Sequence, residues 1–174
     1  DEKELNLKEL SSLISSTFKN TTYDISFEPG RYLVANAGVV ITKILTTKIN
    51  ESVNYLIADA GMQTLLRPAI YNAFHNIIAL TNFNNDKIEY TVAGPICESS
   101  DILAKKILLS RQQTGNYLAI CDTGAYGAVM SSNYNTKGLP AEVLVSNDNF
   151  SIIRNHERVS NIIDRDIIPD WLRD

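Results

Sequence analysis

Apolar and polar residues follow two different rhythms along the chain, and the change falls near Gly38. In residues 4–19 apolar side chains recur every three or four positions, which predicts an amphipathic helix with a stripe of Leu7, Leu10, Leu13, Ile14 and Phe18. Residues 23–27 form a short β-prone run that ends at the charged loop 28–31. A helix and a buried strand with charges at its carboxyl end are typical of the last unit of a (β/α)8 barrel, because such barrels build their sites there.

Beyond Gly38 the pattern indicates a β domain. Short β-prone runs, separated by Gly, Asn and Asp turn signals, predict strands over residues 39–49, 54–60, 87–93, 117–121, 141–145 and 150–154. Helical insertions are expected at residues 68–76 and just beyond Gly124, with a terminal helix over 162–172. The fold class is therefore mostly β with α: residues 1–37 as the end of a (β/α)8 barrel, and residues 38–174 as an antiparallel β-sandwich or barrel domain.

Composition narrows the function. The 174 residues are 44% hydrophobic and 21% charged, with a net charge of −4 and no cluster of Lys or Arg, which argues against nucleic acid or an anionic membrane surface as partner. No apolar run approaches the roughly 20 residues that span a bilayer. The 2 Cys are interpreted as free thiols, which fits a reducing cytoplasm. The acidic, polar start at Asp1 leads us to expect a piece of a longer protein.

Two short motifs could bind anions. In the first, Glu28 could hold a ring nitrogen protonated, Gly30 could let backbone N–H approach a phosphate, and Arg31 could bind an anion bidentately. The alternative is a polar β-turn with a surface ion pair. In the second, Arg67 and Tyr71 lie four residues apart at the start of a helix, where a small carboxylate would be well received. The alternative places Arg67 in solvent and Tyr71 in the core.

Two further segments carry reactive or small residues. Cys97 and Glu98 place a thiol beside a carboxylate after a Gly-Pro turn. The alternative is a small buried Cys next to a solvated Glu, which is the commoner arrangement. Cys121 is interpreted as a core residue. Residues 122–128 form a small-residue loop whose N–H groups could hold a phosphate together with the Tyr126 hydroxyl, but no Lys and Ser or Thr follow as in a P-loop.

The two histidines give no catalytic or metal signature. His75 and His156 have no Cys, His or carboxylate at metal-ligand spacing, so we expect no metal site. No arrangement of Ser or Cys with His and Asp can be argued around them either. Both are interpreted as structural or surface histidines.

Five motifs, in this order, resemble the C-terminal part of the diaminopimelate decarboxylase family of pyridoxal-phosphate enzymes. They are EPGRYLVANAG at 28–38, DAGM at 59–62, RPAIYNAFH at 67–75, GPICESSD at 94–101 and DTGAYGAVMSSNYN at 122–135. The family's fold is a cofactor-carrying barrel followed by a β domain, so the resemblance implies the last barrel unit and the whole β domain here. It implies decarboxylation of meso-diaminopimelate to L-lysine.

The resemblance implies roles position by position. Glu28 would pair with the pyridine nitrogen of pyridoxal phosphate, Gly30 and Tyr126 would contact its phosphate, and Arg31 would lie at the cofactor and substrate. Further residues are implied to bind the distal end of the substrate, with Tyr126 also beside it: Arg31, Arg67, Tyr71 and Glu98. Cys97, the implied proton donor, and Glu98 would enter the partner's site across a homodimer interface, so that a monomer would be incomplete.

The Cys-Glu-Ser sequence favours diaminopimelate over the related ornithine and arginine decarboxylases, where Cys-Asp is expected. Ser100, Phe74 and Thr123 depart from the residues usual in the family. The lysine that carries the cofactor lies earlier in the barrel, and no Lys of this chain falls in a matching motif. The resemblance thus implies a fragment that is inactive without the missing N-terminal barrel portion. The alternatives are an ornithine- or arginine-type decarboxylase and a non-catalytic interaction module of the same fold.

Overall fold

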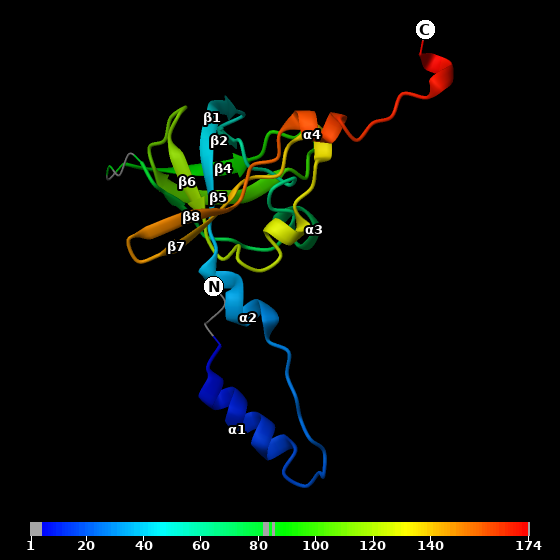
Figure 1. Cartoon of the computed structure of the whole chain (residues 1–174). Helices are drawn as coiled ribbons and strands as arrows, with labels where there is room; N and C mark the ends of the chain where they lie inside the picture. Colours follow the sequence, from blue (N-terminus) through cyan, green and yellow to red (C-terminus); the bar gives the residue numbers. More distant parts are fainter. Residues whose placement is uncertain (1–4, 82–83, 85, 174) are drawn as a thin grey trace.

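The amino-terminal part of the chain projects from a compact β domain in the computed structural model, which describes residues 5–81, 84 and 86–173 (Figure 1). Helix α1 (Leu7–Thr17) begins at Asn6, whose side chain accepts hydrogen bonds from the amides of Lys8 and Glu9 and so caps the first turn. Most of its apolar stripe is exposed, with Leu13 63% exposed, whereas Leu10 and Ile14 are half-buried. The predicted helix over 4–19 is confirmed over residues 7–17, and none of its described residues is fully buried.

The predicted strand over residues 23–27 is not formed. This segment is extended and exposed, and it leads into the short helix α2 (Gly30–Val34) and the 3-10 turn η1 (Ala35–Ala37). A β-strand requires a hydrogen-bonded neighbour, and none of the described residues provides one. The assignment of residues 1–37 to a barrel therefore stays a proposal.

A six-stranded sheet in the order β3-β6-β1-β2-β4-β5 forms the body of the domain. The strands are β1 (Val40–Asn50), β2 (Val53–Ala58), β3 (Ile77–Ala79), β4 (Lys87–Ala93), β5 (Ile102–Ser110) and β6 (Tyr117–Ile120). Neighbours are antiparallel except β2 and β4, which pair in parallel from Asn54 with Tyr90 to Ile57 with Ala93. The two edge strands β3 and β5 approach each other, so the sheet is nearly closed into a barrel.

The sheet encloses one apolar core. Fully buried apolar side chains come from β1, β2, β4 and β6 and from the connection after β2, and they include Ile44, Leu56, Leu65, Val92, Leu118 and Ile120. Helix α3 (Arg67–Tyr71) lies on the connection that crosses from β2 towards β3. It ends at Asn72, which adopts a left-handed conformation, so the helix is shorter than the predicted 68–76.

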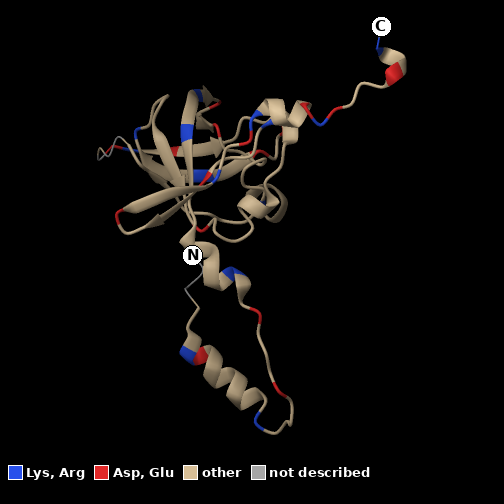
Figure 2. Ribbon diagram, in the orientation of Figure 1, with Lys and Arg blue, Asp and Glu red and all other residues tan. Residues whose placement is uncertain are grey.

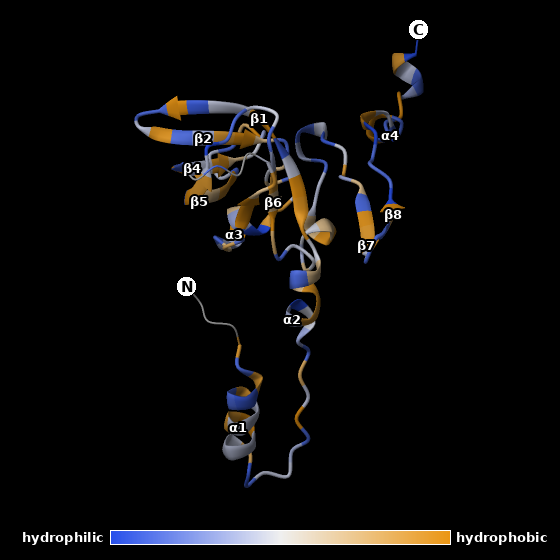
Figure 3. Ribbon diagram, turned by 90° about the vertical axis from the view of Figure 1, so that its left-hand side faces the viewer, coloured by the Kyte–Doolittle hydropathy of each residue, from blue (hydrophilic) through white to orange (hydrophobic). Residues whose placement is uncertain are grey.

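Two predicted strands form a separate hairpin. Strands β7 (Glu142–Ser146) and β8 (Asn149–Arg154) pair only with each other, and their apolar residues, seen in Figure 3, are mostly exposed. The helical turn expected beyond Gly124 is the 3-10 turn η2 (Ala128–Met130), and a second turn, η3 (Tyr134–Thr136), follows.

The predicted helix over 162–172 is broken into two pieces, α4 (Val159–Ile163) and the 3-10 turn η4 (Asp170–Leu172). Pro169 explains the break, because proline removes a backbone donor and disfavours a helical conformation of the residue before it. The tail extends away from the β domain (Figure 1).

Candidate active site

A surface pocket beside α2 brings together the four residues that the family resemblance implies for cofactor binding. Glu28, Gly30 and Arg31 line it from the chain before and within α2, and Tyr126 lines it from the loop after β6. A Cβ added to Gly30 would meet no atom within 4 Å, so the backbone here is open to a ligand. The fold therefore brings Glu28 and Tyr126, which lie nearly one hundred positions apart in the sequence, to the same pocket.

Small residues hold the Tyr126 loop against α2 and η1. The amide of Thr123 donates to the carbonyl of Gly38 at 2.9 Å, and the amide of Gly124 donates to that of Ala35 at 2.9 Å. A Cβ on Gly124 would collide with the carbonyl oxygen of Val34, so glycine is required by this close backbone approach. Tyr126 itself has a positive φ of 58°, a strained conformation typical of functional loops.

The pocket offers complementary polar groups. Glu28, Arg31 and Tyr126 contribute a carboxylate, a guanidinium and a phenol to its lining, together with the open backbone at Gly30. A guanidinium and free N–H groups suit a phosphate, and a carboxylate suits a protonated ring nitrogen. These residues fit a phosphorylated pyridine cofactor, although its covalent lysine has no counterpart in the pocket lining.

Arg67 lies beside a buried histidine. Its Nη1 is 3.3 Å from Nε2 of His75, and Nδ1 of His75 is 2.9 Å from the carbonyl oxygen of Cys121. Burial lowers the pKa of His75, with the charge of Arg67 acting in the same direction, while the Cys121 carbonyl and the charge of Asp122 oppose the change. Tyr71, at the other end of α3, is 63% exposed.

Cys97 and Glu98 lie on an exposed loop outside the pocket lining. The Tyr134 hydroxyl donates to a carboxylate oxygen of Glu98 at 2.5 Å, and the Asn135 side-chain amide is 3.5 Å from the Cys97 sulfur. The hydrogen bond to Glu98 raises the pKa of the Tyr134 phenol, because ionisation would lose that bond and place two negative charges together. The loop therefore exposes its thiol and its carboxylate to solvent, while Asn135 contacts the thiol and Tyr134 contacts the carboxylate.

Asp101 anchors the same loop from beneath. Its buried carboxylate accepts from the amide of Met62 at 2.6 Å and from the amide of Ile96 at 2.7 Å. Burial raises its pKa, and the two amide bonds oppose that effect. Gly61 packs against the carboxylate, where a Cβ would come within 2.6 Å of an oxygen. Ser100 has no positive φ, so it fits this turn without needing the freedom of glycine.

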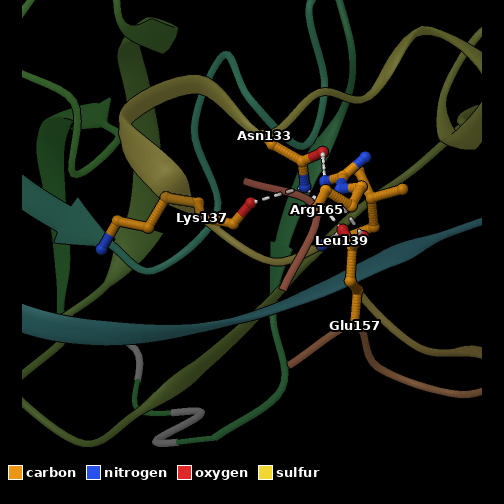
Figure 4. Close-up of polar contacts among 5 residues, drawn as sticks. All are labelled: Asn133, Lys137, Leu139, Glu157 and Arg165. Atoms are coloured by element: carbon orange, nitrogen blue, oxygen red, sulfur yellow. Dashed lines mark hydrogen bonds and ion pairs between the residues drawn. The ribbon is translucent and has the colours of Figure 1, made fainter. Parts of the chain in front are cut away.

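A polar cluster ties the Tyr134 segment to the carboxyl-terminal part of the chain (Figure 4). The side-chain amide of Asn133 donates to the Glu157 carboxylate at 2.6 Å and to the Lys137 carbonyl at 3.0 Å. The backbone amide of Leu139 donates to the same carboxylate at 3.3 Å. Arg165 reaches Glu157 at 3.7 Å. These hydrogen bonds lower the pKa of Glu157, Asn133 contributing most, so the residue stays a charged acceptor.

Charge elsewhere on the molecule is dispersed. Figure 2 shows Lys and Arg scattered over the ribbon, with acidic residues between them. Among the described residues, no three His, Cys, Asp or Glu side chains gather as a metal site would require. No described helix is long and apolar enough to cross a bilayer.

Residues 21–124 match the model of the pyridoxal-dependent decarboxylase C-terminal sheet domain. The chain belongs to this family. Among proteins similar to this decarboxylase domain, a diaminopimelate decarboxylase of Aquifex aeolicus is 40% identical over 164 residues, which cover 94% of this chain and 39% of that protein. The resemblance found in the sequence is thus confirmed.

Solved structures agree. The crystal structure of diaminopimelate decarboxylase from M. jannaschii is 36% identical, with a TM-score of 0.89 over 99% of this chain and 41% of that one. The Helicobacter pylori enzyme complexed with L-lysine is 34% identical, with a TM-score of 0.83 over 94% of this chain and 40% of that one. This decarboxylase domain therefore spans about two fifths of the length of the relatives it matches.

From the sequence, no role at the site was assigned to three residues that support it. His75, Asp101 and Tyr134 contact Arg67, the Cys97 loop and Glu98, through partners that lie 5 to 46 positions away in the chain. The available signal was their place inside the motifs RPAIYNAFH, GPICESSD and DTGAYGAVMSSNYN. Cys121, expected in the core, is only half-buried and lies just after β6.

Proposed function

We propose that this chain is the C-terminal portion of a pyridoxal-phosphate-dependent decarboxylase that converts meso-diaminopimelate to L-lysine and CO₂. The observation that carries the proposal is the pocket in which Glu28, Gly30, Arg31 and Tyr126 meet. Membership of the decarboxylase family and the similarity to proteins named diaminopimelate decarboxylase support the substrate.

The cofactor would be held by the pocket residues. Tyr126 and the Gly30 backbone would bind the phosphate, Arg31 would neutralise it, and Glu28 would keep the ring nitrogen protonated. The cofactor, when bound, supplies an electron sink for the charge left by loss of CO₂. The lysine that binds it covalently would come from the N-terminal barrel portion, which this chain lacks.

The remaining residues would act on the substrate. Arg67, Tyr71 and Arg31 would bind the distal carboxylate, which is retained, and Glu98 would bind the distal amine. Cys97 would deliver a proton to the carbon from which CO₂ departs. Because Cys97 and Glu98 lie outside the pocket lining, they would serve the partner's pocket in a homodimer. A cytoplasmic location would keep the exposed thiol of Cys97 reduced.

The test is reconstitution. This chain is produced together with the barrel portion of a homologous diaminopimelate decarboxylase, and CO₂ release is measured from meso-diaminopimelate and from ornithine. We expect turnover of diaminopimelate only, and loss of most turnover in Cys97→Ser but not in Cys121→Ser. Turnover of ornithine alone would overturn the substrate. Unchanged turnover in both Cys97→Ser and Arg67→Ala would overturn the catalytic role of this domain.

The isolated chain provides a second test. Mixed with pyridoxal phosphate and reduced with borohydride, it should give no adduct on one specific lysine by mass spectrometry. A single reduced lysine adduct would contradict the assignment of that lysine to the missing portion.

A further inference from the structure

The ring of His75 lies at a junction between two parts of the site. It is 1% exposed and lies between α3 and the end of β6, just before β3. One ring nitrogen faces the guanidinium of Arg67, and the other faces the backbone carbonyl of Cys121. The amide of Cys121 in turn donates to the Asn76 carbonyl at 2.8 Å, so the histidine segment is fastened to the end of β6 twice.

The chemistry of the two partners fixes the location of the imidazole proton. A carbonyl oxygen can only accept, so Nδ1, 2.9 Å from the Cys121 oxygen, must carry a hydrogen. A guanidinium can only donate, so Nε2, 3.3 Å from Nη1 of Arg67, must offer its lone pair. Both contacts are satisfied together only by the neutral ring protonated at Nδ1.

We propose that His75, in this neutral Nδ1–H tautomer, is a positioning residue that fixes the guanidinium of Arg67 against the end of β6. Protonation would place a hydrogen on Nε2 facing a cation and break the contact with Arg67. Rotation of the ring would lose the Cys121 bond and leave a buried donor unpaired.

The charges around the ring favour this state. Arg67 from α3 opposes protonation, and Asp122, which follows β6, favours it. Lys105 of β5 lines the same surface hollow as His75. Burial is the largest influence and keeps the pKa of His75 low, so the ring stays neutral near pH 7.

The consequence for substrate binding rests on the proposed function. Cys121 is followed directly by the loop that carries Tyr126, so one imidazole joins the arginine proposed for the distal carboxylate to the loop proposed for the phosphate. A side chain as long as arginine loses much of its freedom when a second group fixes its head. His75 therefore orients Arg67 before the substrate arrives.

The tautomer can be observed directly in this chain without any cofactor. Long-range ¹H–¹⁵N spectra distinguish the two tautomers, and the same spectra of the urea-unfolded chain provide the reference for a histidine without these contacts. We expect His75 to be protonated at Nδ1 alone near pH 7 and, because burial lowers its pKa, to gain a second proton at a lower pH in the folded chain than in the unfolded chain. A ring protonated at Nε2, or one that titrates at the same pH in the folded and the unfolded chain, would overturn the proposal.

Variants test the positioning itself. In His75→Asn the shorter amide can still reach the Cys121 carbonyl but offers nothing to Arg67, so we expect the Arg67 side-chain ¹⁵N signal to narrow and move to the position of an exposed arginine; His156→Asn should leave it unchanged. An unmoved Arg67 signal in folded His75→Asn would overturn the proposal.

In the reconstituted enzyme, His75→Asn should raise KM for diaminopimelate about tenfold or more with a smaller change in kcat, as expected when a hydrogen bond to a charged group is lost. If the tautomer and the Arg67 signal behave as expected but KM does not change, the positioning of Arg67 stands and its proposed role in substrate binding fails.

Discussion

Replacing Asp101 with alanine should destabilise the β domain well beyond an ordinary surface mutation. Its carboxylate is 2% exposed and accepts two short hydrogen bonds, from the amides of Met62 and Ile96. In Asp101→Ala both amides lose their acceptor, and the loop that carries Cys97 loses its anchor.

The magnitude follows from these two bonds. Hydrogen bonds to a charged acceptor contribute about 1.5–3 kcal/mol each, so together they give roughly 3–6 kcal/mol. Part of this is offset by the cost of burying the charge, which is also why the pKa of Asp101 is raised. We therefore expect Asp101→Ala to lower the free energy of unfolding by about 2–4 kcal/mol.

Urea unfolding followed by circular dichroism measures this change from the midpoint and slope. Asp170→Ala is the matched control, because the Asp170 side chain is 95% exposed in its ion pair with Arg173 and should change stability by less than about 1 kcal/mol. Hydrogen exchange should also speed up at the Met62 and Ile96 amides. If Asp101→Ala were as stable as Asp170→Ala, the anchoring role would be refuted.

Three further changes test other contacts. Gly124→Ala should destabilise the chain by roughly 1–3 kcal/mol or more because its Cβ collides with the Val34 carbonyl, whereas Gly30→Ala, with open space around it, should unfold at nearly the same urea concentration; equal losses would contradict the packing. The lowered pKa of His75 means that the unfolded chain binds its proton at higher pH than the folded chain, so its contribution to stability is complete above about pH 6.5 and is lost as the pH falls through the folded-state value. Urea midpoints across that range should depend less on pH in His75→Asn, and identical profiles would count against the burial of a neutral ring. Glu98→Gln should lower the pKa of the Tyr134 phenol towards that of an exposed tyrosine, seen by ultraviolet titration against Tyr134→Phe; an unmoved titration would contradict the hydrogen bond.

The regular elements were predictable where the local pattern is strong. The strands over 39–49 and 87–93 and the helix over 4–19 follow from side-chain periodicity alone. Strand β5 was missed because Lys105 and Lys106 interrupt its apolar run and Lys106 has a positive φ near a shift in register. Strand β3 was also missed, because its 3 residues are too few to show a periodic pattern. The parallel pairing of β2 with β4 depends on long-range closure that no local pattern encodes.

The site was predictable only in part. Motifs indicated Glu28, Gly30, Arg31 and Tyr126, and the fold brings them to one pocket. The role of His75 could not be seen, because its carbonyl partner at Cys121 lies 46 residues away. The sequence interpretation of His75 as a structural residue agrees with its burial but misses its contact with Arg67.

The parallel pairing of β2 with β4 has a consequence for how the chain becomes functional during folding. Parallel neighbours cannot be joined by a tight hairpin, so residues 59–86 must cross over before the pair closes. Arg67 and His75 lie on that crossover, and Cys97 follows the strand that closes it. Contacts between distant parts of a chain form slowly, and the site should therefore appear with the final cooperative step of refolding rather than in an early intermediate.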